Sequence, residues 1–320
     1  MGRDNYEETH RGGVIIVTSL IILTNIPSAY ADNGLLLAND TADLISDVAP
    51  DQGSVITPVV TQTEVTTTNN DTNVTIPVNP DQTISVTDAN STLKGVSPVQ
   101  ISLPEEVDVN KARVANDGTV VYQASQKHGS HGAVQALSDG SVRIQTIMTS
   151  NQGPHEFTYD FENVSLSTHN DGTIRLTQVT SYPGFVVETV VGEIASAWAV
   201  DANGNPVSTH YEILDNGKLR QVIDTTAATA YPVVADPRVE WHWGSLSMVV
   251  YFDRGETLKL ARGGEATAVL SGVGNGIIGA YVAGWALYAQ WAYDDGVCFS
   301  ATLHAVGTWW WPGRYSGGYC

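Results

Sequence analysis

The side chains of this sequence that could bind a metal ion or act as an acid or base are mainly histidines. His128 and His131 have the spacing of two metal ligands. His128-Gly129-Ser130-His131 resembles half of a metal site, because two imidazoles three residues apart can share one ion. The pair lies in a Gly/Ser stretch where solvated histidines are common. The other candidates are scattered along the chain: His155, Glu156, His169 and His210.

No motif of a known catalytic type accompanies these residues. The sequence lacks a Gly-x-Ser-x-Gly elbow, a phosphate-binding loop and a His-Glu-x-x-His pair. We therefore predict no catalytic residue, no metal site and no cofactor, so the expected protein is not an enzyme.

The two cysteines, Cys298 and Cys320, both lie in the last segment. An even pair in an exported chain predicts a disulfide, which stabilises a fold by roughly 3 kcal/mol for a loop of this size. The alternative is a catalytic thiol paired with His304. No third group orders such a pair, and an oxidising compartment disfavours a free thiol.

Small residues recur every four positions within a stretch of 28 uncharged residues between Glu265 and Asp294. In a helix this spacing places them on one face, where a second helix can approach closely. A helix over 266–292 would be roughly 40 Å long, enough to cross a hydrocarbon core of about 30 Å. The members of this glycine zipper are Ala268, Gly272, Gly276, Ala280 and Gly284.

Two interpretations of the zipper stay open: a membrane-active helix, or a buried helical hairpin with a turn at Gly274-Asn275-Gly276. A single-pass anchor is disfavoured, because Asp294-Asp295 follows the stretch where Lys or Arg is typical. Seven of the eight tryptophans come after residue 240, and Trp is typical of membrane interfaces. The predicted interface aromatics are Trp285, Trp291, Trp309, Trp310 and Trp311.

The N-terminal segment predicts export. Arg3 and Arg11 precede the apolar stretch 14–23, and Ala29-Tyr30-Ala31 gives the small-x-small pattern of a signal peptidase site. We expect residues 1–31 to be removed, with cleavage between Ala31 and Asp32. An uncleaved N-terminal anchor is the alternative, and it fits the short apolar core less well. The expected location is secreted, extracellular.

Acidic charge is concentrated in the front of the mature chain. The net charge is −19, and residues 32–237 carry −17 of it, because residues 1–31 and residues 238–320 each carry −1. Such a polyanionic region disfavours nucleic acid as a partner and helps to keep an apolar tail soluble. Solvation of an ordinary surface is the simpler explanation of the same charges.

Three regions follow the signal peptide. Residues 32–97 are rich in Thr, Asn and Asp without aromatics, which predicts a pro-segment or linker that is mostly disordered, with short extended stretches at most. Residues 98–237 alternate apolar and polar positions between Asn-Gly and Asp-Gly dipeptides, which predicts an all-β domain, either a sandwich or a meander. Residues 238–320 form a small helical, Gly-rich and aromatic tail, in which Asp253 or Thr257 is expected to cap a helix over 256–261.

The junction and the chain end carry a resemblance to a family. The segments Trp198–Val207, Ala230–Pro237 and Val250–Thr257, with the closing Gly317-Gly318-Tyr319-Cys320, resemble uncharacterised secreted proteins of Gram-positive bacteria, mostly actinobacteria. The resemblance covers roughly 155–320 and implies an organism class and a layout, with no chemistry to carry over. The tail also resembles the layout of unmodified bacteriocins, without their usual basic character.

Two functions are therefore expected. The first is a secreted precursor from which a protease, cutting near Asp236, Pro237 and Arg238, releases a C-terminal bacteriocin-like antimicrobial peptide. Its partner would be a bacterial membrane or a second copy of the tail. The second is a non-enzymatic cell-envelope or adhesion protein whose aromatic tail binds a surface.

Overall fold

The structure, a computed structural model, describes residues 38–50, 53–69, 71–90, 96–243, 247–263, 282–304 and 310–320. It is mainly β, with three antiparallel sheets in these residues, as the hairpin dipeptides predicted. The first sheet has the order β1 (Val59–Val60), β2 (Glu64–Thr68), β3 (Thr72–Pro77), β4 (Ile84–Asp88), β5 (Val99–Ile101) and β11 (Phe161–Glu162). The smallest has the order β10 (Glu156–Tyr159), β17 (Leu219–Asp224) and β16 (Ser208–Ile213).

The largest sheet holds 13 strands and extends from the front of the chain to its end. Its main path is β22 (Trp310–Tyr315), β21 (Cys298–His304), β20 (Ser247–Phe252), β14 (Phe185–Ile194), β19 (Arg238–Trp241), β9 (Val142–Met148), β8 (Ser130–Ala136), β7 (Val120–Tyr122) and β6 (Arg113–Val114). Four further strands branch from this path: β12 (Ser165–Thr168), β13 (Ile174–Tyr182), β15 (Ala199–Val200) and β18 (Val233–Ala235). The described helices are α1 (Ala38–Val48), α2 (Arg254–Ala261) and α4 (Val282–Asp294).

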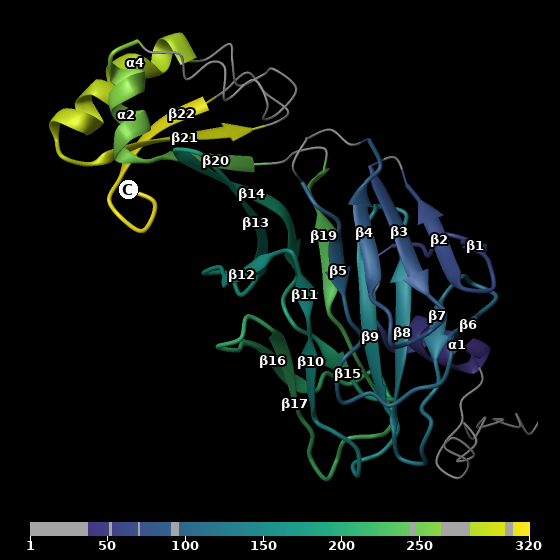
Figure 1. The fold of residues 1–320 in the computed structure, drawn as a ribbon. Coiled ribbons are helices and arrows are strands. Elements are labelled where there is room, and N and C mark those ends of the chain that lie inside the picture. Colours follow the sequence, from purple (N-terminus) through teal and green to yellow (C-terminus); the bar gives the residue numbers. More distant parts are fainter. Residues whose placement is uncertain are drawn as a thin grey trace, which may run out of the picture.

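Figure 1 shows these elements in two parts. A body contains α1 and β1–β19, and a smaller C-terminal lobe contains β20, β21, β22, α2 and α4. The long hairpin of β13 and β14 connects them (Figure 1). The turn glycines of the predicted hairpins adopt positive φ, which confirms the turn assignment: Gly118, Gly140, Gly172, Gly204 and Gly217.

The prediction of disorder for residues 32–97 is wrong for the part of that stretch that the structure describes. Helix α1 and strands β1–β4 form there, and Val65, Val74 and Val86 are buried. The apolar residues alternate with Thr, Asn and Ser at a period of two, and threonine suits a pleated strand because it is β-branched. The many polar residues made this alternation hard to recognise in the sequence. The apolar side chains form a buried face only because a second sheet covers them.

Both faces of the central strands are covered, so every residue of β7, β8 and β9 is buried. Val120 and Val134 face the core shared with the first sheet. Val121 and Ala133 face the other way and pack with Ile45 of α1. Successive side chains of a strand point to opposite faces, so α1 and the first sheet together bury both sets. The segment expected to be a linker therefore completes the body.

Strand β14 joins the body to the lobe by pairing with two strands along one edge. Residues 185–190 pair with β20, and residues 192–194 pair with β19. A Cβ on Gly192 would lie 2.6 Å from the carbonyl oxygen of Glu240, so only glycine allows β19 to approach there. The backbone hydrogen bonds of one sheet thus run from the body into the lobe.

The core of the lobe consists largely of aromatic rings and is continuous with the core of the body. Phe252 of β20 lies 5.8 Å from Trp285 of α4 and 5.6 Å from Phe299 of β21, measured between ring centroids. Helix α2 begins at Arg254, two residues before the predicted start, and its cap is Asp253, one of the two predicted caps, which accepts a hydrogen bond from the Glu256 amide at 2.8 Å. Its C-terminal neighbour Gly263 has a positive φ.

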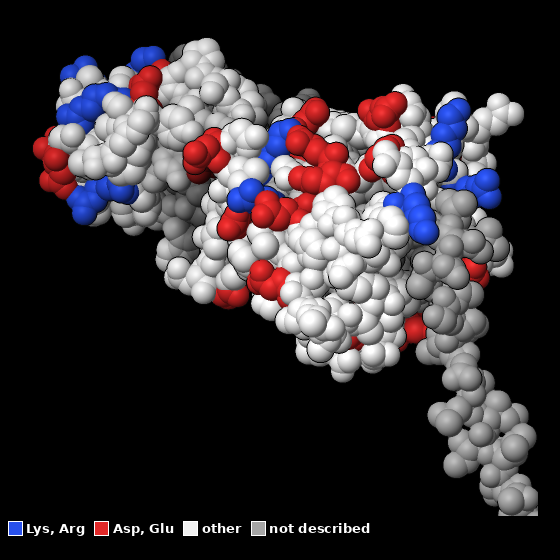
Figure 2. All heavy atoms as spheres, turned by 90° about the horizontal axis from the view of Figure 1, so that it is seen from below, with Lys and Arg blue, Asp and Glu red and all other residues white. Residues whose placement is uncertain are grey.

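The charges in Figure 2 are mixed, although the chain is strongly acidic. Acidic side chains gather across the middle of this face with Lys and Arg among them, and the lobe shows both signs. Several of the ion pairs lie within the smallest sheet, such as Arg220 of β17 with Glu156 of β10 at 3.0 Å. Exposed pairs of this kind add little stability, about 0–1 kcal/mol each.

Candidate binding site

The predicted histidine pair does not form a site. His131 is buried in β8, where its Nδ1 accepts a hydrogen bond from the Ala124 amide at 2.8 Å. Burial lowers the pKa of His131 to about 4, so this ring is neutral at physiological pH. The expectation that both histidines are solvated is thus wrong for His131. Within the described residues, no three His, Cys, Asp or Glu side chains lie together as metal ligands would.

The cysteine prediction is confirmed. Cys298 and Cys320 form a disulfide with a Cα–Cα distance of 5.6 Å. The sulfur of Cys298 is therefore not a free nucleophile, and His304 lies at the other end of β21 from it. A disulfide is consistent with an extracellular protein.

The segment predicted for processing is buried. Residues 233–237, which include Asp236 and Pro237, have no exposed side chain, and β18 pairs with β9 on one side and β15 on the other. The side chain of Arg238 contacts Asp139 at 2.5 Å. The prediction that this segment is accessible to a protease is therefore wrong for the folded protein. A protease needs an exposed segment of chain that can enter its active site, and this segment is buried. Ala31 and Asp32 lie outside the described residues.

Asp236 is held inside the body by specific hydrogen bonds. Its Oδ1 accepts from the Trp198 amide and from the Tyr211 hydroxyl, both at 3.1 Å. Burial raises the pKa of Asp236 to about 7. The hydroxyl of Tyr159 lies 3.4 Å from the backbone oxygen of the same residue. These contacts anchor the start of β19 and leave no access for a substrate.

One glycine of the predicted zipper is described. Gly284 lies near the start of α4, where an added Cβ would be 3.2 Å from Cζ2 of Trp310. It therefore lies against an aromatic ring of β22. Ala268, Gly272, Gly276 and Ala280 lie outside the described residues. None of the helices in the described ranges is long and apolar enough to cross a membrane.

The predicted interface aromatics divide into a buried and an exposed set. Trp285 is fully buried, with its ring 5.5 Å from Trp310, so it is a core residue of the lobe. Trp291 and Trp311 are 50 % and 65 % exposed. Trp309 lies outside the described residues. The separation follows from α4 itself, because Trp285, Ala289 and Ala292 lie on its buried face and Trp291 does not.

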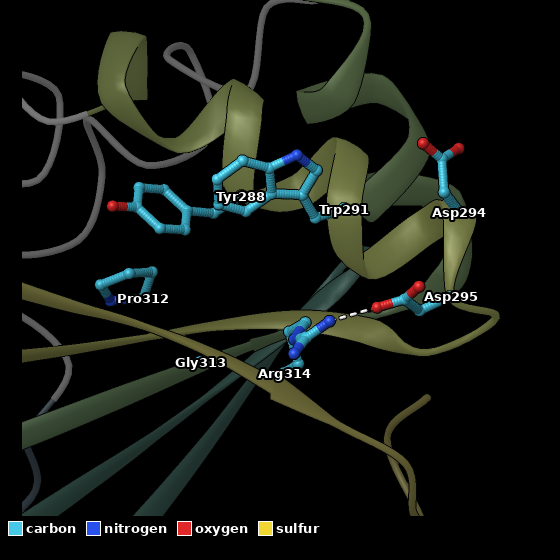
Figure 3. A pocket seen from close by; sticks show the side chains of 7 residues that line it. All are labelled: Tyr288, Trp291, Asp294, Asp295, Pro312, Gly313 and Arg314. Carbon is cyan, nitrogen blue, oxygen red and sulfur yellow. Dashed lines mark hydrogen bonds and ion pairs between the residues drawn. The ribbon is translucent and has the colours of Figure 1, made fainter.

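Trp291 lines a slot of about 450 Å³ between α4 and β22. Figure 3 shows Tyr288 and Trp291 extending from the helix on one side, with Pro312 and Gly313 of the strand on the other. Asp295 and Arg314 face each other at one end of the slot (Figure 3). Asp294 also lines it.

The slot carries two carboxylates, of Asp294 and Asp295, and one guanidinium, of Arg314. The guanidinium of Arg314 pairs with Oδ2 of Asp295. Asp294 uses Oδ1 to accept from the side-chain amide of Gln290 at 2.7 Å. Since the ion pair lies at the surface, it fixes geometry more than it contributes stability. The slot therefore offers two aromatic rings, a stretch of strand and a set of strong donors and acceptors.

Arg254 of α2 fixes the end of α4 that carries the slot. Its guanidinium donates to the carbonyl oxygens of Tyr293 at 2.9 Å and Val297 at 2.7 Å, and it lies 4.1 Å from the centroid of the Tyr293 ring. A cation at the C-terminus of a helix satisfies carbonyl groups that lack a partner within the helix. The position of Trp291 relative to β22 is thus set by a residue 37 positions earlier in the chain.

Sequence reasoning named Trp291 but missed Tyr288, Asp295 and Arg314 as its neighbours. Tyr288 and Trp291 are three residues apart, which places them together on a helix and was available as a signal. Arg314 comes from β22, and its approach to Asp295 depends on how the strand pairs with β21. No local pattern in the sequence encodes that approach.

Comparisons with known proteins add no assignment. No family model matches the sequence, and no curated protein matches it. The resemblance to secreted Gram-positive proteins therefore remains an expectation from the quoted segments. A function for this chain has to be argued from its own residues.

Proposed function

We propose that this chain is a secreted, non-enzymatic binding protein, which holds its C-terminal lobe on the body and presents the lobe's aromatic surface to a partner at a cell envelope. The observation that carries the proposal is the continuity of the large sheet. Strand β14 pairs with β19 and β20 at once, so the lobe shares backbone hydrogen bonds with the body.

The burial of residues 233–237 supports the same function. Release of the tail as a peptide would require the chain to be cut in a strand that is paired on both sides. It would also strip β20 from β14, along six paired positions. A lobe that works while attached needs neither step.

The surface of the lobe supports a binding role. Leu287, Tyr288 and Trp291 are large apolar side chains exposed on one helix, α4. Large exposed apolar side chains that gather in one region mark sites of interaction, because water does not favour them there. Aromatic residues in addition dominate the energetics of binding surfaces.

The test is sedimentation of the purified secreted protein with cell envelopes of a Gram-positive bacterium, together with its intact mass. We expect a single chain that begins at Asp32 and carries the disulfide, and that sediments with the envelopes. Trp291→Ala should reduce the bound fraction, whereas the matched variant Val179→Ala, at an exposed site in the body, should not. Protein that stays in the supernatant at all envelope concentrations would refute the proposal.

Peptide release stays as a second proposal, favoured by the concentration of tryptophan after residue 240. It makes a distinct prediction for the same mass measurement. A free fragment of about 9 kDa, at roughly 110 Da for each of the 83 residues after Pro237, would appear in the culture supernatant. Leakage of liposomes by that fragment would then decide whether it acts on membranes.

A further inference from the structure

The slot between α4 and β22 brings two aromatic rings, Tyr288 and Trp291, together with the charged groups of Asp294, Asp295 and Arg314. A larger hollow of about 530 Å³ lies between α1 and the strands behind it, but no aromatic ring is among its described lining residues, which are aliphatic, serine and glycine residues beside Gln135, Arg143 and Asp117. From the slot we infer that the lobe binds a neutral saccharide, stacked on Trp291 and Tyr288 and hydrogen-bonded to Asp295 and Arg314. This inference rests on the proposed binding function and names its ligand class.

The size of the slot suits a small polar ligand. Its volume of about 450 Å³ is within the range of roughly 300–1,000 Å³ typical of small-molecule sites. It is open to solvent along α4, so a sugar unit within a longer glycan can enter while its neighbours stay outside. Pro312 and Gly313 form the strand side of the slot (Figure 3).

The two aromatic rings present different surfaces to the slot. The centroids of Tyr288 and Trp291 are 5.4 Å apart, and their planes make an angle of 79°. The face of an aromatic ring is negative, and the C–H groups on one side of a sugar ring carry partial positive charge. A sugar ring therefore stacks on the face of an aromatic ring. A cation is attracted to the same face more strongly.

The aromatic wall is supported from behind. Tyr288 meets Trp310 edge-on with centroids 5.9 Å apart, and Trp310 in turn meets the buried Trp285 at 5.5 Å. This chain of contacts connects the slot to the core of the lobe. A ring held in place before binding loses less conformational freedom on binding, which favours a specific site.

The ion pair at the end of the slot matches hydroxyl groups. The guanidinium of Arg314 carries donors alone, and the carboxylate of Asp295 carries acceptors alone. Each sugar hydroxyl both donates and accepts, so neighbouring hydroxyls can bind the two charged groups together. Hydrogen bonds to charged groups are stronger than neutral ones, which makes this pair the polar anchor of the site.

The charges of the slot disfavour ionic ligands. An anion would meet the carboxylates of Asp294 and Asp295, and a cation would meet the guanidinium of Arg314. A purely apolar ligand would cover the ion pair without replacing its hydrogen bonds to water, at a cost in free energy. A neutral ligand with one apolar face and several hydroxyls avoids all three costs.

The experiment is calorimetric titration of the full mature chain with four soluble neutral probes: cellotetraose, tetra-N-acetylchitotetraose, xylotetraose and mannotetraose. We expect at least one to bind. Trp291→Ala should weaken that binding about tenfold or more, equivalent to about 1.4 kcal/mol. Arg314→Gln should also weaken it severalfold, because it removes the charged donors. The matched control is Trp311→Ala, which removes an exposed tryptophan outside the lining of the slot and should change affinity less than twofold.

Three results would overturn the inference. One is that none of the four probes binds at millimolar concentration. Another is that Trp311→Ala weakens binding as much as Trp291→Ala. The last is that tetramethylammonium binds with a dependence on Trp291 while the saccharides do not. If wild-type protein sediments with envelopes but no probe binds, the saccharide inference fails and the proposed function stands; if it does not sediment, the proposed function fails.

Discussion

The body and the lobe bury apolar surface in different ways. The body places aliphatic side chains of two sheets against each other, such as Val74 and Ile84 of the first sheet with Val134 and Ile144 of the large one. The lobe is smaller and uses rings, with Phe252, Trp285 and Phe299 in mutual contact. A few large rings exclude as much water as many aliphatic groups.

This difference explains why the candidate site belongs to the lobe. A short helix over a sheet edge can bury one face, so the rings on its other faces stay in water. Trp291 and Tyr288 are such rings, while the body exposes Val59, Val60 and Val179 as its large apolar side chains among the described residues. A small aromatic core therefore leaves aromatic groups available for binding.

The largest expected effect comes from a substitution in the core of the lobe. Trp285→Ala removes a fully buried ring, and such truncations cost about 3–5 kcal/mol of unfolding free energy. Trp291→Ala removes a half-exposed ring and should cost less than about 1 kcal/mol. Urea denaturation followed by tryptophan fluorescence compares the two. Equal destabilisation would mean that the buried and exposed sets are not distinct.

The next effect concerns the disulfide, which closes the lobe. Cys298→Ser with Cys320→Ser should lower the unfolding free energy by about 3 kcal/mol, because the unfolded chain regains the freedom of a 22-residue loop. Thermal unfolding with and without reductant measures it. Wild-type protein in reductant should match the double variant, and a melting temperature unchanged in both would show that the bond adds nothing to stability.

A smaller effect is expected where the zipper meets the sheet. Gly284→Leu adds a side chain at a position only 3.2 Å from Trp310, and overpacking of this kind costs about 1–3 kcal/mol. Gly317→Ala is the control, because an added Cβ there meets nothing within 4 Å. Differential scanning calorimetry compares them. A stabilised Gly284→Leu would instead mean that helix propensity outweighs the contact.

The last prediction concerns the pH dependence of the unfolding free energy, which changes by the smallest amount for each pH unit. It tests whether the body and the lobe unfold together. The pKa of Asp236 is raised from 3.8 to about 7, so between these values the folded state holds a proton that the unfolded state has lost. Because of this carboxyl, the free energy of unfolding falls by about 1.4 kcal/mol for each unit that the pH rises in this range. The pKa of His131 is lowered from 6.5 to about 4, so stability rises with pH across that range by a similar amount.

The two groups oppose each other between pH 4 and 6.5, and two variants separate them. In His131→Asn the stability should fall as pH rises, and in Asp236→Asn it should rise. Denaturation curves at several pH values measure both slopes. Both groups lie in the body, so tryptophan fluorescence, which reports mostly on the region after residue 240, should show the same slopes if the molecule unfolds as one unit. Slopes seen by circular dichroism alone would show that the lobe unfolds separately.

Local patterns predicted much of the secondary structure. The Asp-Gly and Asn-Gly turns, the capping of α2 by Asp253 and the disulfide each depend on a few neighbouring residues or on a small count, and the structure confirms them. The prediction of disorder for residues 32–97 failed in the part that the structure describes. Composition does not show which strand faces a second sheet will cover.

By itself the sequence determined the β-rich class, the hairpins and the chemical character of the lobe, since turn preference, strand alternation and aromatic content are local properties. Tertiary structure alone decided which residues meet. It placed residues 233–237 inside a sheet, gave His131 and Asp236 their unusual pKa values and brought Arg314 opposite Asp295. Burial and pairing between distant strands arise from packing over the whole chain, and a residue's neighbours in sequence carry little information about its neighbours in space.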